Sequence, residues 1–281
     1  MTTIVIAVVA MLILGLAFGI GLAIASRAFA VDEDERVEEV LDALPGANCG
    51  ACGYGGCRAY AEAVVEGEDV DLCTAGGPEV TEAVAEIMGV ETESRTEMRA
   101  VVHCKGGTDN CGMRADYDGE EDCRAADITG GGPKACPWGC LGFGSCAEAC
   151  PFDAITMNDQ RLPVIDPEKC TACGICVGVC PRDLISLLNK EYTMYLGCSS
   201  RDSGKTVKDV CDVGCITCGM CERKDPNEAV KMENGLPELD YEKADGDFSV
   251  AADVCPMDSY VVEKEIRTTE EEPQETARQT G

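Results

Sequence analysis

The chain has 281 residues, of which 21 are cysteine, and 52 acidic against 23 basic residues give it a formal net charge of −29. That excess of negative charge argues against nucleic acid as a partner, and it fits a well-solvated surface, a salt-rich cytosol or a partner with a basic docking face. Only 5% of the residues are aromatic, so a large apolar core is excluded and small cysteine-rich domains need disulfides or metals to hold them together.

The chain begins with an uncharged segment, TTIVIAVVAMLILGLAFGIGLAIAS at residues 2–26. As a helix it is longer than the hydrocarbon core of a bilayer requires. The tripeptide AFA at 28–30 has the form of a signal-peptidase site, but no basic residue precedes the apolar run, which is too long for a signal peptide. We therefore expect residues 1–30 to be a retained transmembrane anchor. Arg27 and Arg36 follow it, which predicts a single-pass protein of the cell membrane with its other domains on the cytoplasmic side.

Residues 31–89 are predicted to form a small helical domain. Residues 32–44 follow a helical period, with Asp32 as the N-cap. Residues 57–66 and 78–88 are also predicted to be helical, the last because a proline opens the segment and a glycine follows it.

The cysteines of this domain indicate a metal centre. Disulfides would need an oxidising compartment, which the predicted cytoplasmic side does not provide, whereas closely spaced thiols can wrap a metal. Glycines around the loop let backbone N–H groups approach sulfur, and the spacing is not that of a zinc ribbon. We expect one [4Fe–4S] cluster bound by Cys49, Cys52, Cys57 and Cys73. The polar residues 90–100 are predicted to be a linker.

Residues 101–195 carry the strongest motif, KCTACGICVGVCP at 169–181. It has the C-x2-C-x2-C-x3-C-P spacing of bacterial ferredoxins, in which the fourth cysteine binds the other cluster of a pair. The partner motif, GCLGFGSCAEACP at 139–151, has Phe143 where its second cysteine is due, and Cys136 upstream can replace it. Crossed ligation then predicts two clusters, one held by Cys136, Cys140, Cys146 and Cys180 and the other by Cys150, Cys170, Cys173 and Cys176.

Residues 196–262 repeat this architecture with one cluster fewer. In GCITCGMCERKDP, at 214–226, an aspartate stands where the fourth cysteine is due. One set of crossed ligands is complete: Cys215, Cys218, Cys221 and Cys255. The other set would need cysteine at Asp225, Ala244, Asp247 and Val250. Because every loss falls in one set, we expect this repeat to have lost one whole cluster and kept the other.

Five cysteines are left over: Cys104, Cys111, Cys123, Cys198 and Cys211. Four of them could bind a fifth cluster and leave one free thiol. The repeat symmetry offers another set, Cys123 and Cys136 with Cys198 and Cys211, which would take Cys136 from its neighbour. Several could instead be buried free thiols. Four clusters are therefore expected, or five, and the charged residues 263–281 are predicted to form a disordered acidic tail.

The combined pattern resembles the B-type subunit of the Rnf complex, a membrane-bound, ferredoxin-oxidising, ion-translocating oxidoreductase, in its long multi-cluster form. The resemblance spans residues 1–262 and rests on the anchor, on ALPGANCGACGYGGC with Cys73, on AADITGGGPKACPWGCLGFGSCAEACPFDAI and on KCTACGICVGVCP. It implies that the chain takes electrons from soluble reduced ferredoxin and passes them to other membrane subunits. Ion movement and the terminal acceptor would then belong to those subunits.

We therefore expect an α+β protein with an N-terminal transmembrane helix, a small helical iron–sulfur domain and two bacterial-ferredoxin-like repeats. No G-x-G-x-x-G opens a helix after a strand, so no flavin or nicotinamide site is expected and the redox chemistry belongs to the clusters. Two alternatives stay open. One is the iron–sulfur subunit of a small-molecule reductase, with an open iron site that Phe143 would create if Cys136 did not bind. The other is a structural zinc protein.

Overall fold

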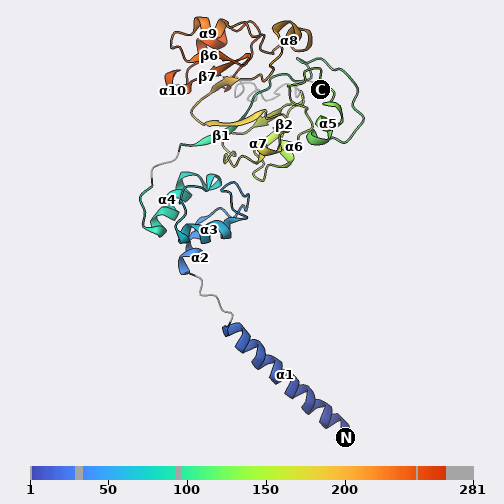
Figure 1. The fold of residues 1–281 in the computed structure, drawn as a ribbon, viewed down its shortest axis with the longest axis vertical. Coiled ribbons are helices and arrows are strands. Elements are labelled where there is room, and N and C mark those ends of the chain that lie inside the picture. The colour runs from blue at the N-terminus through green and yellow to red at the C-terminus, as the bar shows by residue number, and fades with distance from the viewer. Residues whose placement is uncertain (1, 29–33, 93–95, 245, 264–281) are drawn as a thin grey trace, which may run out of the picture.

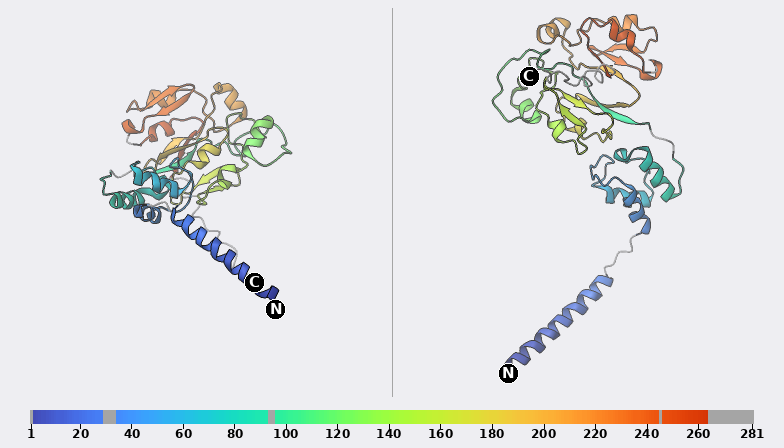
Figure 2. Two further views of the ribbon diagram at one scale, coloured as in Figure 1. Left: turned by 60° about the horizontal axis from the view of Figure 1, so that its bottom comes forward. Right: turned by 180° about the vertical axis from the view of Figure 1, so that it is seen from behind.

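Short helices alternate with two-stranded antiparallel sheets in the computed structural model, which describes residues 2–28, 34–92, 96–244 and 246–263. Figure 1 shows helix α1, a helical domain and two units of mixed structure following one another along the long axis. The same order is seen from behind in Figure 2. The predicted tail at 263–281 lies outside the described residues except for Glu263.

Helix α1 (Thr2–Ala28) contains a stretch, Ile4–Ser26, that is long and apolar enough to cross a membrane. None of this stretch is buried against the rest of the protein. Large apolar side chains such as Leu12, Leu16 and Phe18 are exposed, which suits lipid rather than water. By length and composition, the predicted anchor is therefore a candidate membrane span.

The N-terminal domain consists of α2 (Glu35–Ala43), α3 (Cys57–Glu66), a 3-10 turn η1 (Thr74–Gly76) and α4 (Gly77–Met88). Their apolar faces meet in a core that includes Val40, Tyr60, Val64 and Val84, all fully buried. The Tyr60 hydroxyl donates to Asp69 O (2.9 Å) and accepts from Leu72 N (3.2 Å). Tyr60 therefore fixes the loop that leads to Cys73.

The start of α2 differs from the sequence-based expectation. Asp34 is the N-cap, and its carboxylate accepts a hydrogen bond from Arg36 N (3.0 Å). The expected cap, Asp32, lies outside the described residues. The other two helices begin within one residue of the predicted positions.

Two units with the same order of elements follow the N-terminal domain. In the first unit, β1 pairs with β4 and encloses three short helices and a β2–β3 hairpin. Its elements are β1 (Met98–Val102), α5 (Cys123–Gly130), α6 (Ser145–Glu148), β2 (Ile155–Met157), β3 (Pro163–Ile165), α7 (Ile175–Val179) and β4 (Ile185–Asn189). In the second unit, β5 pairs with β8 around the same order of elements, with one extra short helix. Its elements are β5 (Met194–Leu196), α8 (Gly204–Val210), α9 (Met220–Lys224), β6 (Val230–Glu233), β7 (Leu236–Leu239), α10 (Tyr241–Ala244), α11 (Ser249–Asp253) and β8 (Tyr260–Val262).

Strand β1 begins inside the segment 90–100 that the sequence predicts to be a linker. Its register with β4 runs from Met98 opposite Asn189 to Val102 opposite Ile185. Ala100 is buried here because it packs with Val102 and Ile185 in the core of the first unit. The last three residues of the predicted linker therefore belong to this unit.

Side chains that follow β1 tie the two units together. The ring of His103 contacts Ser186 Oγ in the first unit (2.7 Å) and Leu196 O in the second (2.8 Å), and burial lowers the pKa of His103. Lys105 Nζ donates to the Asp258 carboxylate and to Tyr260 O, both at 2.8 Å. The single histidine of the chain is thus a packed residue at the junction of the units.

Candidate metal centres

Site A is a cavity of about 310 Å³ in the N-terminal domain, lined by the four thiols that the sequence predicts as one set: Cys49, Cys52, Cys57 and Cys73. The loop can curl around the cavity because Gly50 and Gly53 take left-handed conformations (φ 73° and 88°). The Asn48 side chain closes the loop by accepting a hydrogen bond from Cys57 N (2.9 Å), the first residue of α3. The structure thus brings these four thiols together.

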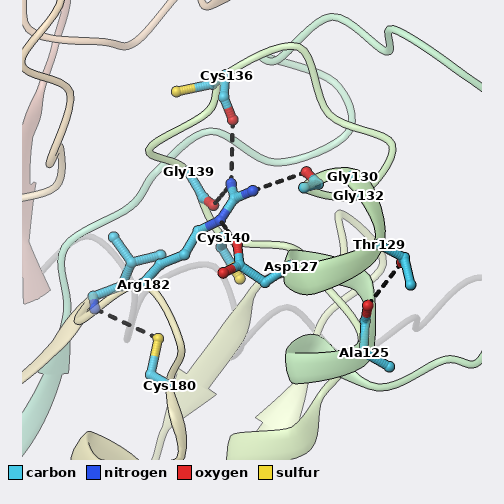
Figure 3. A network of polar contacts seen from close by, with 12 residues as sticks. Ala125, Asp127, Thr129, Gly130, Gly132, Cys136, Gly139, Cys140, Cys180 and Arg182 are labelled. Atoms are coloured by element: carbon cyan, nitrogen blue, oxygen red, sulfur yellow. Dashed lines mark hydrogen bonds and ion pairs between the residues drawn. The ribbon is translucent and has the colours of Figure 1, made fainter.

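Site B is a cavity of about 420 Å³ in the first unit, and its lining corrects the predicted ligand set. The thiols around it are Cys123, Cys140, Cys146 and Cys180. Cys136, which the sequence analysis assigns to this set, lines a different cavity. Figure 3 shows Cys136 on the far side of the Arg182 guanidinium from Cys140 and Cys180.

Polar contacts between two helix starts explain the position of Cys123. Cys123 is the first residue of α5, and its N–H donates to Ser145 Oγ (2.8 Å) at the start of α6. The Ser145 hydroxyl donates to one carboxylate oxygen of Asp122 (2.9 Å), and the other oxygen caps α5 by accepting from Ala125 N (2.8 Å). Since Cys146 is the second residue of α6, this network holds both thiols at one cavity.

The Phe143 side chain, at the vacant ligand position, packs away from site B. Its ring centre lies 5.0 Å from that of Tyr117 and 5.1 Å from the Arg161 guanidinium. Cys123 was not predicted in this role because it lies far upstream of the motif. The aspartate before it, a typical N-cap at the start of a helix, was the available signal.

Arg182 fastens the loop between site B and the neighbouring cavity (Figure 3). Its guanidinium donates to Asp127 Oδ1 (3.0 Å) in α5, to Gly139 O (2.7 Å) and Cys136 O (3.3 Å) in the loop, and to Gly131 O (2.8 Å). The side chain is only 9% exposed and lines site B, so its positive charge lies beside the thiols. Sequence reasoning missed this residue, although it directly follows the C-P pair of the ferredoxin motif.

Site C collects the other predicted set of the first unit: Cys150, Cys170, Cys173 and Cys176. The Cys173 thiol interacts with that of Cys150, and the Cys176 thiol with those of Cys170 and Cys173. Ala100 N, in β1, donates to Cys170 Sγ (3.4 Å). Two further interactions link the sites, because Cys176 lies near Cys146 of site B and Cys173 near Cys49 of site A.

Site D is a cavity of about 340 Å³ in the second unit, lined by the predicted Cys215, Cys218, Cys221 and Cys255. Asp225, at the missing ligand position, accepts hydrogen bonds from Asn227 N (3.1 Å), Ala229 N and Val230 N (2.7 Å). Its carboxylate therefore closes the turn between α9 and β6. Where the first unit has site C, the second has a core with buried Ala244 and Phe248, and Tyr241 packs edge-on against Phe248 with ring centres 5.1 Å apart.

A central hollow of about 370 Å³ lies at the junction of the two units. It is lined by five cysteines: Cys104, Cys111, Cys136, Cys198 and Cys211. Of the symmetry-based set in the sequence analysis, Cys136, Cys198 and Cys211 do lie here, whereas Cys123 lies in site B.

The chemistry of the thiols fits bound clusters. Burial raises the pKa of Cys140 to about 12 and that of Cys146 to about 11, so these thiols would keep their protons without a bound cation. Backbone N–H groups also point at sulfur, as Ser259 N does at Cys255 (3.4 Å). Within the part of the chain that the structure describes, no three His, Cys, Asp or Glu side chains converge on a single-ion position. The cavities therefore suit a wider, polynuclear group.

Comparison with known proteins agrees with this chemistry. Two family models match the chain, "Putative Fe-S cluster" over residues 44–75 and "4Fe-4S dicluster domain" over residues 137–187. These matches confirm that the chain carries [4Fe–4S] clusters.

Whole-chain relatives were also found, all of them B-type subunits of ion-translocating complexes. The chain is 44% identical over 246 residues to that of the Na(+)-translocating ferredoxin:NAD(+) oxidoreductase complex of Acetobacterium woodii, covering 87% of this chain and 74% of that relative. It is 43% identical over 246 residues to that of the ion-translocating oxidoreductase complex of Methanosarcina acetivorans, covering 87% and 92%. It is 41% identical over 242 residues to that of the proton-translocating ferredoxin:NAD(+) oxidoreductase complex of Clostridium ljungdahlii, covering 85% of each chain.

Proposed function

This chain belongs to the family of B-type subunits of the Rnf complex, and from that premise we propose that it takes electrons from soluble reduced ferredoxin and relays them to membrane subunits of its complex. As a member of this family it is an electron-transfer subunit of an ion-translocating oxidoreductase complex and is associated with the membrane. Bound clusters supply one-electron transfer, and the chain's part is to bind and position them. Two of the relatives are named for ferredoxin and NAD(+), which supports ferredoxin as the donor here.

The proposed ligands are the four thiols of each of sites A to D. The dicluster match at 137–187 contains seven cysteines, one fewer than two [4Fe–4S] clusters need. Cys123 supports the assignment as the eighth, because it lines site B with Cys140, Cys146 and Cys180. The resulting arrangement is two ferredoxin-like repeats, the first with two sites and the second with one.

The observation that carries the proposal is that thiols of successive sites are neighbours. Cys49 of site A interacts with Cys173 of site C, and Cys176 of site C with Cys146 of site B. The second unit, which holds site D, lies at the opposite end from the N-terminal domain (Figure 1). With α1 in the membrane and the units in the cytoplasm, a soluble donor meets the two units first, and site A hands electrons to a membrane partner.

A single-turnover experiment on the assembled complex tests this order. Cys57→Ser, which removes a site A ligand, should leave the first uptake of electrons from ferredoxin intact and stop transfer to the membrane subunits. Cys218→Ser, which removes a site D ligand, is the matched control and should slow the first uptake. Loss of the first uptake in Cys57→Ser, with the EPR signals of the other sites still present, would mean that site A is the entry point.

The small-molecule reductase alternative depended on an open iron site in the first unit. Cys123 lines site B where Phe143 provides no ligand, so the first unit has a full set of thiols. No other observation favours the reductase.

A further inference from the structure

The central hollow contains more thiols than any of the sites A to D, yet the proposed function assigns it no role. Its volume of about 370 Å³ falls between those of site A, about 310 Å³, and site B, about 420 Å³. It is thus a cavity of the same size, lined by the same donor, as the sites that hold clusters. Its five cysteines come from both units, whereas each of the sites A to D lies in one domain or unit.

The hollow is built symmetrically from the two units. Cys104 follows β1, and its sulfur accepts a hydrogen bond from Cys140 N (3.3 Å) of site B. Cys198 follows β5, and its sulfur accepts from Cys215 N (3.2 Å) of site D. Cys140 and Cys215 are themselves equivalent in the two units. Cys104 and Cys198 are therefore equivalent positions, one from each unit.

Cys136 and Cys211 form the second equivalent pair. Each stands four residues before the matching cysteine of site B or site D. Each also faces a glycine, since a Cβ at Gly139 would lie 3.5 Å from the Cys136 sulfur and one at Gly214 would lie 3.6 Å from the Cys211 sulfur. A third glycine lies closer still, because a Cβ at Gly106 would be 3.3 Å from the Cys211 sulfur. Glycine at these positions leaves room beside the thiols that a side chain would fill.

Cys111 has no equivalent in this pattern. It lies opposite Cys211 in an antiparallel bridge between the two units, and the two thiols are hydrogen-bonded to each other. Thiolates bound to different iron atoms of one cluster stand further apart than a hydrogen bond, so Cys111 and Cys211 cannot both be ligands of one cluster. The symmetry selects Cys211 and leaves Cys111 as its hydrogen-bond partner.

A buried cation provides independent support for a negatively charged group in the hollow. Lys134 is 2% exposed, and its ammonium donates to Gly106 O (3.0 Å). Among the described residues no carboxylate pairs with it; the groups that interact with its charge include the thiols of Cys104, Cys111 and Cys140. A buried ammonium is costly without a negative partner. A cluster held by four thiolates carries negative charge and would provide that partner.

We propose that Cys104, Cys136, Cys198 and Cys211 bind a fifth [4Fe–4S] cluster at the junction of the two units, with Lys134 balancing its charge. This site extends the proposed row, because its Cys104 touches site B and its Cys198 touches site D. It gives site D a path to the other sites. The claim concerns metal content and holds whichever protein donates the electrons.

Metal counting on the full-length protein in detergent, reconstituted anaerobically with iron and sulfide, tests the proposal. The wild type should contain about 20 iron atoms per chain, which is five clusters of four. Cys198→Ser should lose about four iron atoms and one EPR signal, and Cys198→Ser combined with Cys218→Ser should lose about eight. Cys111→Ser is the matched control, a buried thiol of the same hollow, and should lose none.

The wild-type count decides the matter even if a variant fails to fold. About 16 iron atoms per chain, or zinc in place of iron in the hollow, would overturn the proposal. So would a full iron content in Cys198→Ser. Ferredoxin oxidation by the wild type is measured separately, so that failure of the proposed function and absence of the fifth cluster give different results.

Discussion

Single side chains replace or support cluster ligands at two positions. The carboxylate of Asp225 binds three backbone N–H groups, where the equivalent residue of the first unit is the thiol Cys150. Arg182 binds carbonyl groups on both sides of the loop that separates Cys136 from Cys140. Asp225 thus has a structural role that does not need metal, and Arg182 positions the loop beside site B.

Asp225→Cys should add no iron, because the other three ligands of that set are absent and side chains such as Phe248 fill the space. It should also destabilise the protein by roughly 1–3 kcal/mol, since three backbone donors lose their acceptor. Asp225→Asn keeps one acceptor oxygen and should cost less. Thermal unfolding and an iron count measure both effects, and a gain of about four iron atoms would refute the crossed-ligand assignment.

Arg182→Gln should make the reduction potential of site B more negative. Loss of one positive charge near the cluster favours its oxidised form by about 1–2 kcal/mol, or about 40–90 mV for a one-electron couple. Arg161→Gln is the control, because Arg161 lies over Phe143, away from the site, and is 41% exposed. Redox-titrated EPR of the signal that disappears in Cys146→Ser measures the shift, and equal shifts in both variants would exclude a local effect of Arg182.

At the scale of elements, the cap of one short helix decides which cysteine reaches site B. Asp122 caps α5 and also accepts a hydrogen bond from Ser145 in α6, so the starts of the two helices are fixed together. The loops of site A depend on glycine and Asn48 in a similar way. Short helices carry the ligands, and their caps set the positions of the thiols.

Asp122→Ala should cost about 1 kcal/mol of helix capping and loosen Cys123 at site B. Iron of site B should therefore be lost faster to a chelator, with the EPR signals of sites A and D unaffected. Asp34→Ala removes the comparable cap of α2 and should not affect site B. If both variants lose the site B signal at the same rate, the contact between α5 and α6 does not control Cys123.

At the scale of the molecule, the two units are joined through β1 as well as through the central hollow. Arg99 in β1 is 2% exposed and pairs with Glu263, directly after β8, while Lys105 binds Asp258 and Tyr260 before and within β8. The ends of the two sheets therefore depend on each other. The predicted tail cannot start before residue 264, because Glu263 makes this buried contact.

Glu263→Ala should destabilise the protein by about 3 kcal/mol, because it leaves the Arg99 guanidinium buried without its partner. Adding Arg99→Met should recover part of the loss, since the unpaired charge is then gone. Lys190→Ala, which removes an exposed ion pair with Glu97 at the same sheet, should cost less than about 1 kcal/mol. Thermal unfolding of the four proteins gives the comparison, and an additive double variant would show that Arg99 and Glu263 are not coupled.

The sequence by itself determined the class of protein, the cofactor and the sites whose ligands lie mostly in one short run. Three thiols of site A, three of site C and three of site D fall within ten residues of one another, so their spacing alone fixes which of them meet. The asymmetry of the second repeat was also visible, because all four missing cysteines belong to one crossed set.

Only the tertiary structure decided between Cys123 and Cys136. Both lie upstream of the motif, and spacing cannot show which one faces site B. The contact between Asp122 and Ser145 brings Cys123 there, and Arg182 holds the loop so that Cys136 faces the other way. The central hollow was beyond local spacing altogether, because Cys104 and Cys198 are 94 positions apart in the numbering and meet only when the two units pack together.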